Sequence, residues 1–216
     1  MIEVKTTREP VEYQKAIKTM EARVEGIRNG SQTELLWFLE HPPIYTAGTN
    51  SNQKDLLSPN RFPVHQTGRG GQYTYHGPGQ RVVYTLFNLK NREADVRQFV
   101  RNLEKVVINT LAEFGVAGER RKGRIGIWVN DGENEKKIAA IGIRIRHWIT
   151  FHGISINVEP NLEHFSGIVP CGISEYGVTS LRDLKVKYTL SSIDNVLKKH
   201  FLNSFDSNIQ KFNKPF

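Results

Sequence analysis

Apolar residues recur every three or four positions in three segments of the chain, a spacing that places them on one face of an α-helix. The predicted helices cover approximately Pro10–Asn29, Asp95–Phe114 and Ser192–Phe205. Pro10 suits the first turn of the first helix, and Gly30 suits the position after its last turn. Asp95 is expected to cap the second helix, because its carboxylate accepts hydrogen bonds from free backbone N–H groups.

Runs rich in β-branched and aromatic residues predict the strands of a sheet. They are Leu35–Leu39, Arg81–Leu89, Ile125–Val129, Lys137–Ile145 and Trp148–Val158. Asn130–Asn134 has the composition of a turn and is expected to join the third and fourth runs into a hairpin. Helices separated by runs of strands indicate an α+β (mixed α/β) fold, with the sheet covered by helices on one face.

The organisation of the chain predicts a single domain over residues 1–216, because no internal repeat, low-complexity segment or linker divides it. The polar tail, residues 206–216, is expected to fray. The longest apolar runs fall far short of the ~20 residues that cross a bilayer, so no membrane association is expected. Met1–Val4 does not begin a secretion signal, and a lone cysteine fits the reducing cytoplasm.

The net charge of +8 favours an acidic partner without naming one. Acidic residues are interspersed among the basic ones, and no zinc-finger, RNP or helix-turn-helix pattern accompanies them. An acidic protein partner is therefore at least as well supported as nucleic acid. No metal site is predicted, because the chain has one cysteine and no His-x-His or His-x-x-x-His pair.

Two stretches before the middle of the chain have unusual compositions. In Glu40–Gly48, two consecutive prolines prevent a helix and favour a rigid lead into a strand. Thr67–Gln80 holds five glycines in fourteen residues, which lets backbone approach a ligand closely. It lacks the Gly-Lys-Ser/Thr of a phosphate-binding loop and the context of a dinucleotide fingerprint. It forms either two glycine turns around a short strand or a substrate-binding loop, and Arg69 and His76 favour the loop.

The remaining candidates for chemistry are Cys171 and Lys137. A lone cysteine is commonly a small buried apolar residue, but Pro170 and Gly172 place Cys171 in a turn that presents its thiol to a cleft. A free thiol has a pKa of about 8.5, and a nearby cation lowers it. Lys137 heads a strand of small residues, where a lysine either snorkels to water or supplies that cation. The alternative base is a histidine, and no spacing singles out one of His41, His65, His76, His147, His152, His164 and His200.

Taken together, these stretches resemble the lipoyl(octanoyl) transferase family. The matching segments are Glu40–Gly48, Arg69–Gln80, Gly123–Val129, Lys137–Gly142, Trp148–Asn157 and Phe165–Leu181. The resemblance implies a fold similar to the catalytic domain of biotin and lipoate protein ligases. It also implies an acyltransferase without a cofactor, which moves an octanoyl group from octanoyl-acyl carrier protein to a lysine of a lipoyl domain in the protein lipoylation pathway. The acceptors would be the E2 subunits of 2-oxoacid dehydrogenases and the glycine cleavage H protein.

The resemblance also assigns roles to residues of this chain. Cys171 would carry the acyl group as a thioester in a ping-pong reaction, and Lys137 would lower the pKa of its thiol and is a candidate general base. The expected substrate-contacting residues are Arg69, Gly70, Gly71, Gln72, Tyr73, Thr74, Tyr75, His76, Ala140, Ile141, Gly142, Gly153, Ile154 and Ser155.

Three other functions are alternatives to this one. An ATP-dependent lipoate or biotin ligase of the same fold would need no cysteine nucleophile. A basic, non-catalytic binding module would show salt-sensitive binding to nucleic acid. A cysteine hydrolase would release the free acid in water. The order of six matching segments favours the octanoyl transferase over all three.

Overall fold

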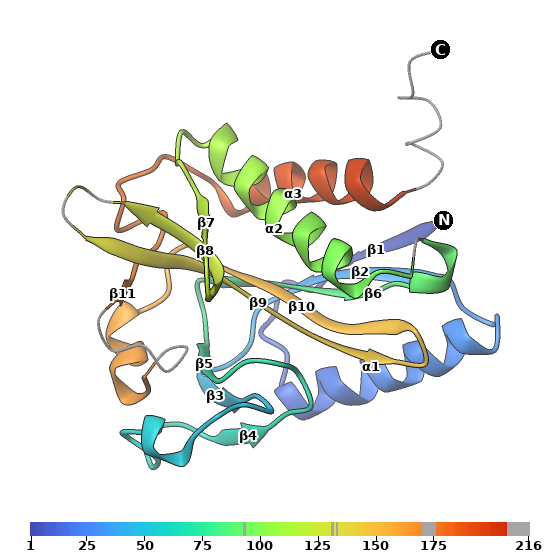
Figure 1. The fold of residues 1–216 in the computed structure, drawn as a ribbon, viewed down its shortest axis with the longest axis horizontal. Coiled ribbons are helices and arrows are strands. Elements are labelled where there is room, and N and C mark those ends of the chain that lie inside the picture. Colours follow the sequence, from blue (N-terminus) through green and yellow to red (C-terminus); the bar gives the residue numbers. More distant parts are fainter. Residues whose placement is uncertain (93, 131, 133, 170–175, 207–216) are drawn as a thin grey trace.

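A computed structural model describes residues 1–92, 94–130, 132, 134–169 and 176–206 (Figure 1). The helices are α1 (Tyr13–Arg28), α2 (Val96–Glu113) and α3 (Leu190–Phe205), and the 3-10 helices are Gln53–Asp55, Leu89–Asn91 and Leu162–Gly167. The strands are β1 (Ile2–Thr6), β2 (Glu34–Leu39), β3 (Ile44–Ala47), β4 (Val64–Gln66), β5 (Tyr73–His76), β6 (Gln80–Leu86), β7 (Glu119–Arg121), β8 (Arg124–Asn130), β9 (Glu135–Arg146), β10 (Ile149–Asn157) and β11 (Gly177–Val178). Residues 207–216 of the tail that was expected to fray lie outside the described residues.

The main sheet is mixed and has the strand order β1-β2-β6-β10-β9-β8-β7, with β11 paired to β9. The β1–β2 and β11–β9 pairs are parallel, and the other pairs are antiparallel. The long strands β9 and β10 form a hairpin in the middle of this sheet (Figure 1). This arrangement confirms the predicted mixed α/β fold.

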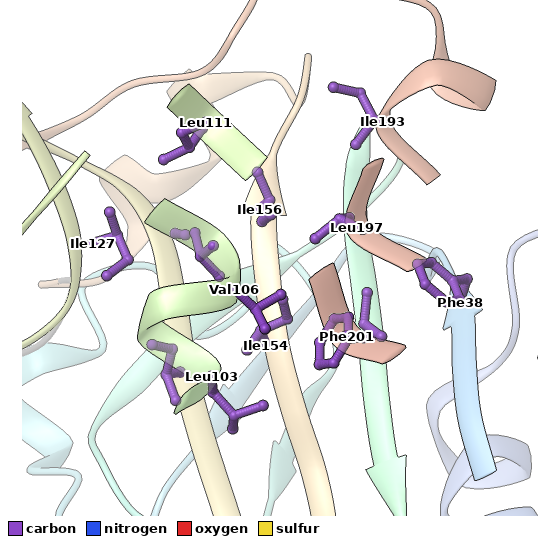
Figure 2. Close-up of a cluster of buried hydrophobic side chains, with 14 of the residues drawn as sticks. Phe38, Leu103, Val106, Leu111, Ile127, Ile154, Ile156, Ile193, Leu197 and Phe201 are labelled. Carbon is purple, nitrogen blue, oxygen red and sulfur yellow. The ribbon is translucent and has the colours of Figure 1, made fainter. Parts of the chain in front are cut away.

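Helices α2 and α3 cover one face of the sheet with a continuous apolar core (Figure 2). Leu103 and Val106 of α2 and Phe201 of α3 are fully buried against it. They meet side chains from alternate positions of β10, such as Ile154 and Ile156. Burying a side chain of this size stabilises the fold by roughly 1.5–3 kcal/mol. This core holds the central strands in place.

Helix α1 covers part of the opposite face, so the prediction that helices cover one face was wrong. Its buried residues Met20 and Val24 pack in a second core with Trp37 of β2 and Tyr84 of β6. Alternation explains this, because successive side chains of a strand point to opposite faces. A sheet with apolar residues on both faces needs cover on both faces.

The predicted helices and the β8–β9 hairpin are confirmed, with corrections at their ends. α1 begins at Tyr13, so Pro10 lies before the helix rather than in its first turn. α3 begins at Leu190, and the predicted first residue, Ser192, instead forms a capping box with Thr189. The run Arg81–Leu89 was too long as a strand, since β6 ends at Leu86.

A smaller sheet of β4, β3 and β5 lies beside the main one (Figure 1). It packs around an aromatic core that includes Tyr45, Tyr75 and Phe165. β3 confirms the strand expected after the two prolines, and β5 is the short strand within the glycine-rich segment. Within the described residues, no helix has the length and apolarity to cross a bilayer.

Candidate functional site

A pocket lies between the glycine-rich segment and strands β6, β9 and β10 of the main sheet. It has an empty volume of about 600 Å³, which includes its opening to solvent. The structure brings together in its lining Lys137 and every residue expected to contact substrate except Tyr75. Tyr75 instead packs in the core of the smaller sheet, where its hydroxyl lies 2.8 Å from Nδ1 of His164.

Arg69 holds the glycine-rich segment in shape. Its guanidinium donates hydrogen bonds to the carbonyl oxygens of Thr46, Gly70 and Gln72 at 2.8 to 3.0 Å. The side chain is 8% exposed, although Arg69 lies in a loop. Gly48 must be a glycine here, because a Cβ atom would overlap with the carbonyl oxygen of Gly71. Arg69 therefore lines the pocket, and its guanidinium is hydrogen-bonded to backbone oxygens of the glycine-rich segment and of Thr46.

Bare backbone forms one wall of the pocket. Gly142 of β9 and Gly153 of β10 are directly paired across the two strands. A Cβ atom on Gly142 would lie 3.0 Å from Cδ of Arg69. A Cβ atom on Gly153 would overlap with the carbonyl oxygen of Val83. Close packing against Arg69 and Val83 therefore favours glycine at both positions, and with Ala140 they make this part of the pocket lining small and apolar.

Lys137 lies in this wall as a buried cation, 7% exposed, rather than as a side chain extended into water. Its Nζ is 5.8 Å from the ring centroid of Trp128, close enough for a cation–π interaction. Gly126 has φ +116°, and a Cβ atom there would overlap with the Lys137 side chain. Lys137 also lines a second, smaller cavity, which shares Thr74, Ala140 and Ser155 with the pocket.

Cys171 lies outside the described residues, but both flanks of its segment are held in place. Before it, the N–H of Val169 donates to the carbonyl oxygen of Asp55 at 2.8 Å. After it, the ring of Tyr176 lies 5.6 Å from that of Trp128, between centroids. The next two residues form β11, in which Val178 is the direct partner of Lys137. The chain that leaves Cys171 therefore returns to the strand that carries Lys137.

A series of buried hydrogen bonds connects His76 in the pocket lining with β9, the strand that carries Lys137. Nδ1 of His76 donates to Oε1 of Gln80 at 2.6 Å, and Nε2 of Gln80 donates to Oδ1 of Asn157 at 3.0 Å. The amide of Asn157 donates to the carbonyl of Thr179, whose N–H donates to the carbonyl of Lys137. Each step satisfies a buried group that would otherwise destabilise the fold.

Three histidines are buried at the pocket: His76 and His152 line it, and His41 lies next to the lining residue Tyr84. Burial lowers the pKa of His41 to about 4 and the pKa values of His76 and His152 to about 3, so all three are neutral at pH 7. His41 Nδ1 lies 2.5 Å from the carbonyl oxygen of Val11 and must carry the proton. Its Nε2 then accepts a hydrogen bond from the hydroxyl of Tyr84 at 2.7 Å.

Sequence reasoning did not assign five lining residues to substrate binding: Tyr13, Val82, Tyr84, Ile125 and His152. Tyr13 starts α1 and is far from the rest of the site in sequence, so no local pattern could reveal it. His152 directly precedes Gly153, and its position in that stretch was the one available signal. No aspartate or glutamate is among the described residues that line the pocket, which makes it unsuited to a cationic ligand.

Comparison with protein families places the site in context. Residues 12–202 match the family model described as the lipoyl protein ligase A/B catalytic domain. An octanoyltransferase from Parvibaculum lavamentivorans is 60% identical over 200 residues, which are 91% of this chain and 89% of the relative.

Solved structures show the same fold at low sequence identity. A bipartite lipoate protein ligase from Thermoplasma acidophilum superposes with a TM-score of 0.69 and 17% identity, over 94% of this chain and 83% of that one. The biotin protein ligase of Aquifex aeolicus gives a TM-score of 0.55 and 14% identity, over 98% and 73%. These likenesses confirm the expected ligase-like fold.

Proposed function

We propose, because the chain belongs to the lipoyl protein ligase A/B catalytic domain family, that it transfers an octanoyl group from octanoyl-acyl carrier protein to a specific lysine of lipoyl domains. The acceptors are the E2 subunits of 2-oxoacid dehydrogenases and the glycine cleavage H protein. The reaction takes place in the cytoplasm and uses no cofactor.

One observation carries the proposal. A narrow pocket walled by Ala140, Gly142 and Gly153 has a buried cation, Lys137, in its lining, and β11 leads from the Cys171 segment back to that cation. The walls suit an apolar acyl chain, and Lys137 suits the carbonyl end, where charge develops during acyl transfer. A Cys171 thiol beside this cation would support covalent catalysis.

In the first half-reaction, the Cys171 thiolate attacks the thioester carbonyl of the donor. A new sulfur–carbon bond forms to Cys171, and the bond to the carrier's thiol breaks. The departing thiolate takes a proton from the Lys137 ammonium. The ammonium also favours the Cys171 thiolate before the attack, because an adjacent cation lowers the pKa of a thiol.

In the second half-reaction, the amine of the acceptor lysine attacks the acyl-Cys171 thioester. The amide bond forms, the bond to Cys171 breaks, and Lys137 accepts the proton that the amine loses. This returns both residues to their starting protonation states. The net charge of +8 fits docking of acidic carrier and acceptor domains in both steps.

Intact-mass measurement after incubation with octanoyl-acyl carrier protein, without ATP, tests the proposal. We expect the added mass of one octanoyl group, which hydroxylamine removes because it cleaves thioesters. Cys171→Ala should form no adduct. Adding a lipoyl domain to the acylated protein should move the group to the acceptor and restore the free thiol.

The outcome separates this function from its closest alternative. Absence of the adduct with a donor of proven activity, together with octanoylation of the lipoyl domain from free octanoate and ATP, would identify an ATP-dependent ligase. Release of free octanoate without transfer to the acceptor would identify a thioester hydrolase.

A further inference from the structure

His152 points to a different face of the sheet from the one its position in β10 predicts. Alternation along β10 would place it with Ile154 and Ile156, in the core beneath α2 and α3. Instead its Nε2 lies 3.1 Å from the hydroxyl of Tyr13 on α1, and its ring lies 5.9 Å from that of Tyr84. The cause is its backbone, which has φ +69°, in the left-handed region. The fold holds this strained conformation and so brings the ring into the pocket lining.

The redirected ring is part of a polar inner wall. Tyr13, Tyr84 and His152 are each 3% or 4% exposed, and all three line the pocket. The hydroxyl of Tyr13 is hydrogen-bonded to Nε2 of His152, and the hydroxyl of Tyr84 is hydrogen-bonded to Nε2 of His41. These polar side chains differ from the small residues Ala140, Gly142 and Gly153 elsewhere in the lining. Nδ1 of His152 is buried, and no described residue provides it with a hydrogen-bond partner.

The spacing along the paired strands gives the distance between the Ala140–Ser155 pair and the level of His152. Ala140 and Ser155, which line the smaller cavity together with Lys137, are directly paired, and Ile143 pairs with His152. These levels are three residues apart on β9, which is about 10 Å at roughly 3.3 Å per residue. An extended octanoyl chain has about this length. A chain whose carbonyl lies at the level of Ala140 and Ser155 would therefore end at His152.

We propose that His152 and Tyr13 form the closed end of the acyl pocket and set its length limit. The inference rests on the proposed octanoyl transfer and adds the residues that select a medium-length chain. A longer chain would press its methyl end against the Tyr13–His152 pair. It would have to separate that pair or leave buried polar groups without partners, and both are unfavourable.

Two variants test the limit with rates of acyl-enzyme formation from octanoyl-, decanoyl- and dodecanoyl-acyl carrier protein. His152→Gly removes the ring at a position where glycine adopts a positive φ without strain, so the variant should fold. Tyr13→Ala opens the same end from α1. In each, we expect the dodecanoyl to octanoyl rate ratio to rise at least about tenfold over the wild type, since a few methylenes in an apolar pocket discriminate by this much or more.

Tyr188→Ala is the matched control, because Tyr188 is not in the pocket lining and its hydroxyl bonds to Glu159. It should keep the wild-type ratio. Unchanged ratios in His152→Gly and Tyr13→Ala, with octanoyl transfer intact, would overturn the length limit and leave the proposed function standing. Failure of the wild type to form an acyl-enzyme with any donor would overturn the proposed function, and the length limit with it.

Discussion

The two faces of the main sheet carry different kinds of residue on the same strands. Beneath α2 and α3, the strands present a continuous apolar core. On the other face, α1 covers β2, β6 and the start of β10, while the remainder of β9 and β10 borders a pocket with buried histidines and tyrosines. In β10, Ile156 belongs to the core, Gly153 and Ser155 belong to the pocket, and Ile154 belongs to the core and also borders the pocket.

This difference shows how the fold separates stability from chemistry. A substitution on the core face should change the free energy of unfolding and leave substrate preference alone. One on the pocket face should change rate or preference with a smaller effect on stability. His152 tests this division, because its left-handed backbone turns its side chain from the α2–α3 face to the pocket face.

The largest effect is expected from Lys137→Met on the pocket face. Removing the cation that favours the Cys171 thiolate should slow formation of the acyl-enzyme by about 10²–10⁴-fold. Stopped reactions analysed by intact mass would measure the rate. Lys136→Met is the control, because Lys136 directly precedes Lys137 on β9 but is not in the pocket lining. Its Nζ lies 4.0 Å from Asp183. Equal rates in the two variants would remove Lys137 from the mechanism.

On the core face, Leu103→Ala should lower the free energy of unfolding by about 2–5 kcal/mol, because it leaves a cavity beneath α2. Urea unfolding followed by circular dichroism would measure the loss. At a temperature where the variant is folded, its relative rates with octanoyl and dodecanoyl donors should match those of the wild type. A changed donor preference would contradict the separation of the two faces.

Gly142→Val should narrow the pocket, since a side chain there would contact Arg69. We expect octanoyl-enzyme formation to slow by about tenfold, which corresponds to about 1.4 kcal/mol. Gly115→Val adds the same side chain outside the pocket and is the control. Because Gly115 has φ +75°, this substitution should lower the stability of the protein and leave the rate unchanged. Comparable slowing with both variants would argue against Gly142 as a pocket wall.

The buried histidines should also make the free energy of unfolding depend on pH. Their folded pKa values of about 3 to 4 lie below the usual value of about 6.5, so the unfolded chain binds more protons between these limits. Stability should therefore fall as pH decreases from about 6.5 toward 4, by roughly 1 kcal/mol per pH unit for each histidine. Urea titrations across this range would measure the slope, and His41→Gln should reduce it.

The sequence predicted the regular elements well where apolar periodicity was long. α2 was expected within one residue at each end, since both its stripe and the Asp95 cap are local signals. β4, β7 and β11 have two or three residues each, too few for any periodicity to show. The second covered face was missed, because a strand pattern does not say which helix packs on which side.

The candidate site divides in the same way into residues that the sequence determined and contacts that only the tertiary structure decided. The local sequence and its family resemblance determined Lys137, the glycine-rich segment and the small residues of β9 and β10, because each is a property of neighbouring positions in the chain. Only the tertiary structure decided that Tyr75 packs away from the pocket and that Tyr13 and His152 meet in its lining. The last contact joins residues 139 positions apart and depends on a left-handed backbone at His152. Packing from several elements imposes that conformation, and no local preference of the chain predicts it.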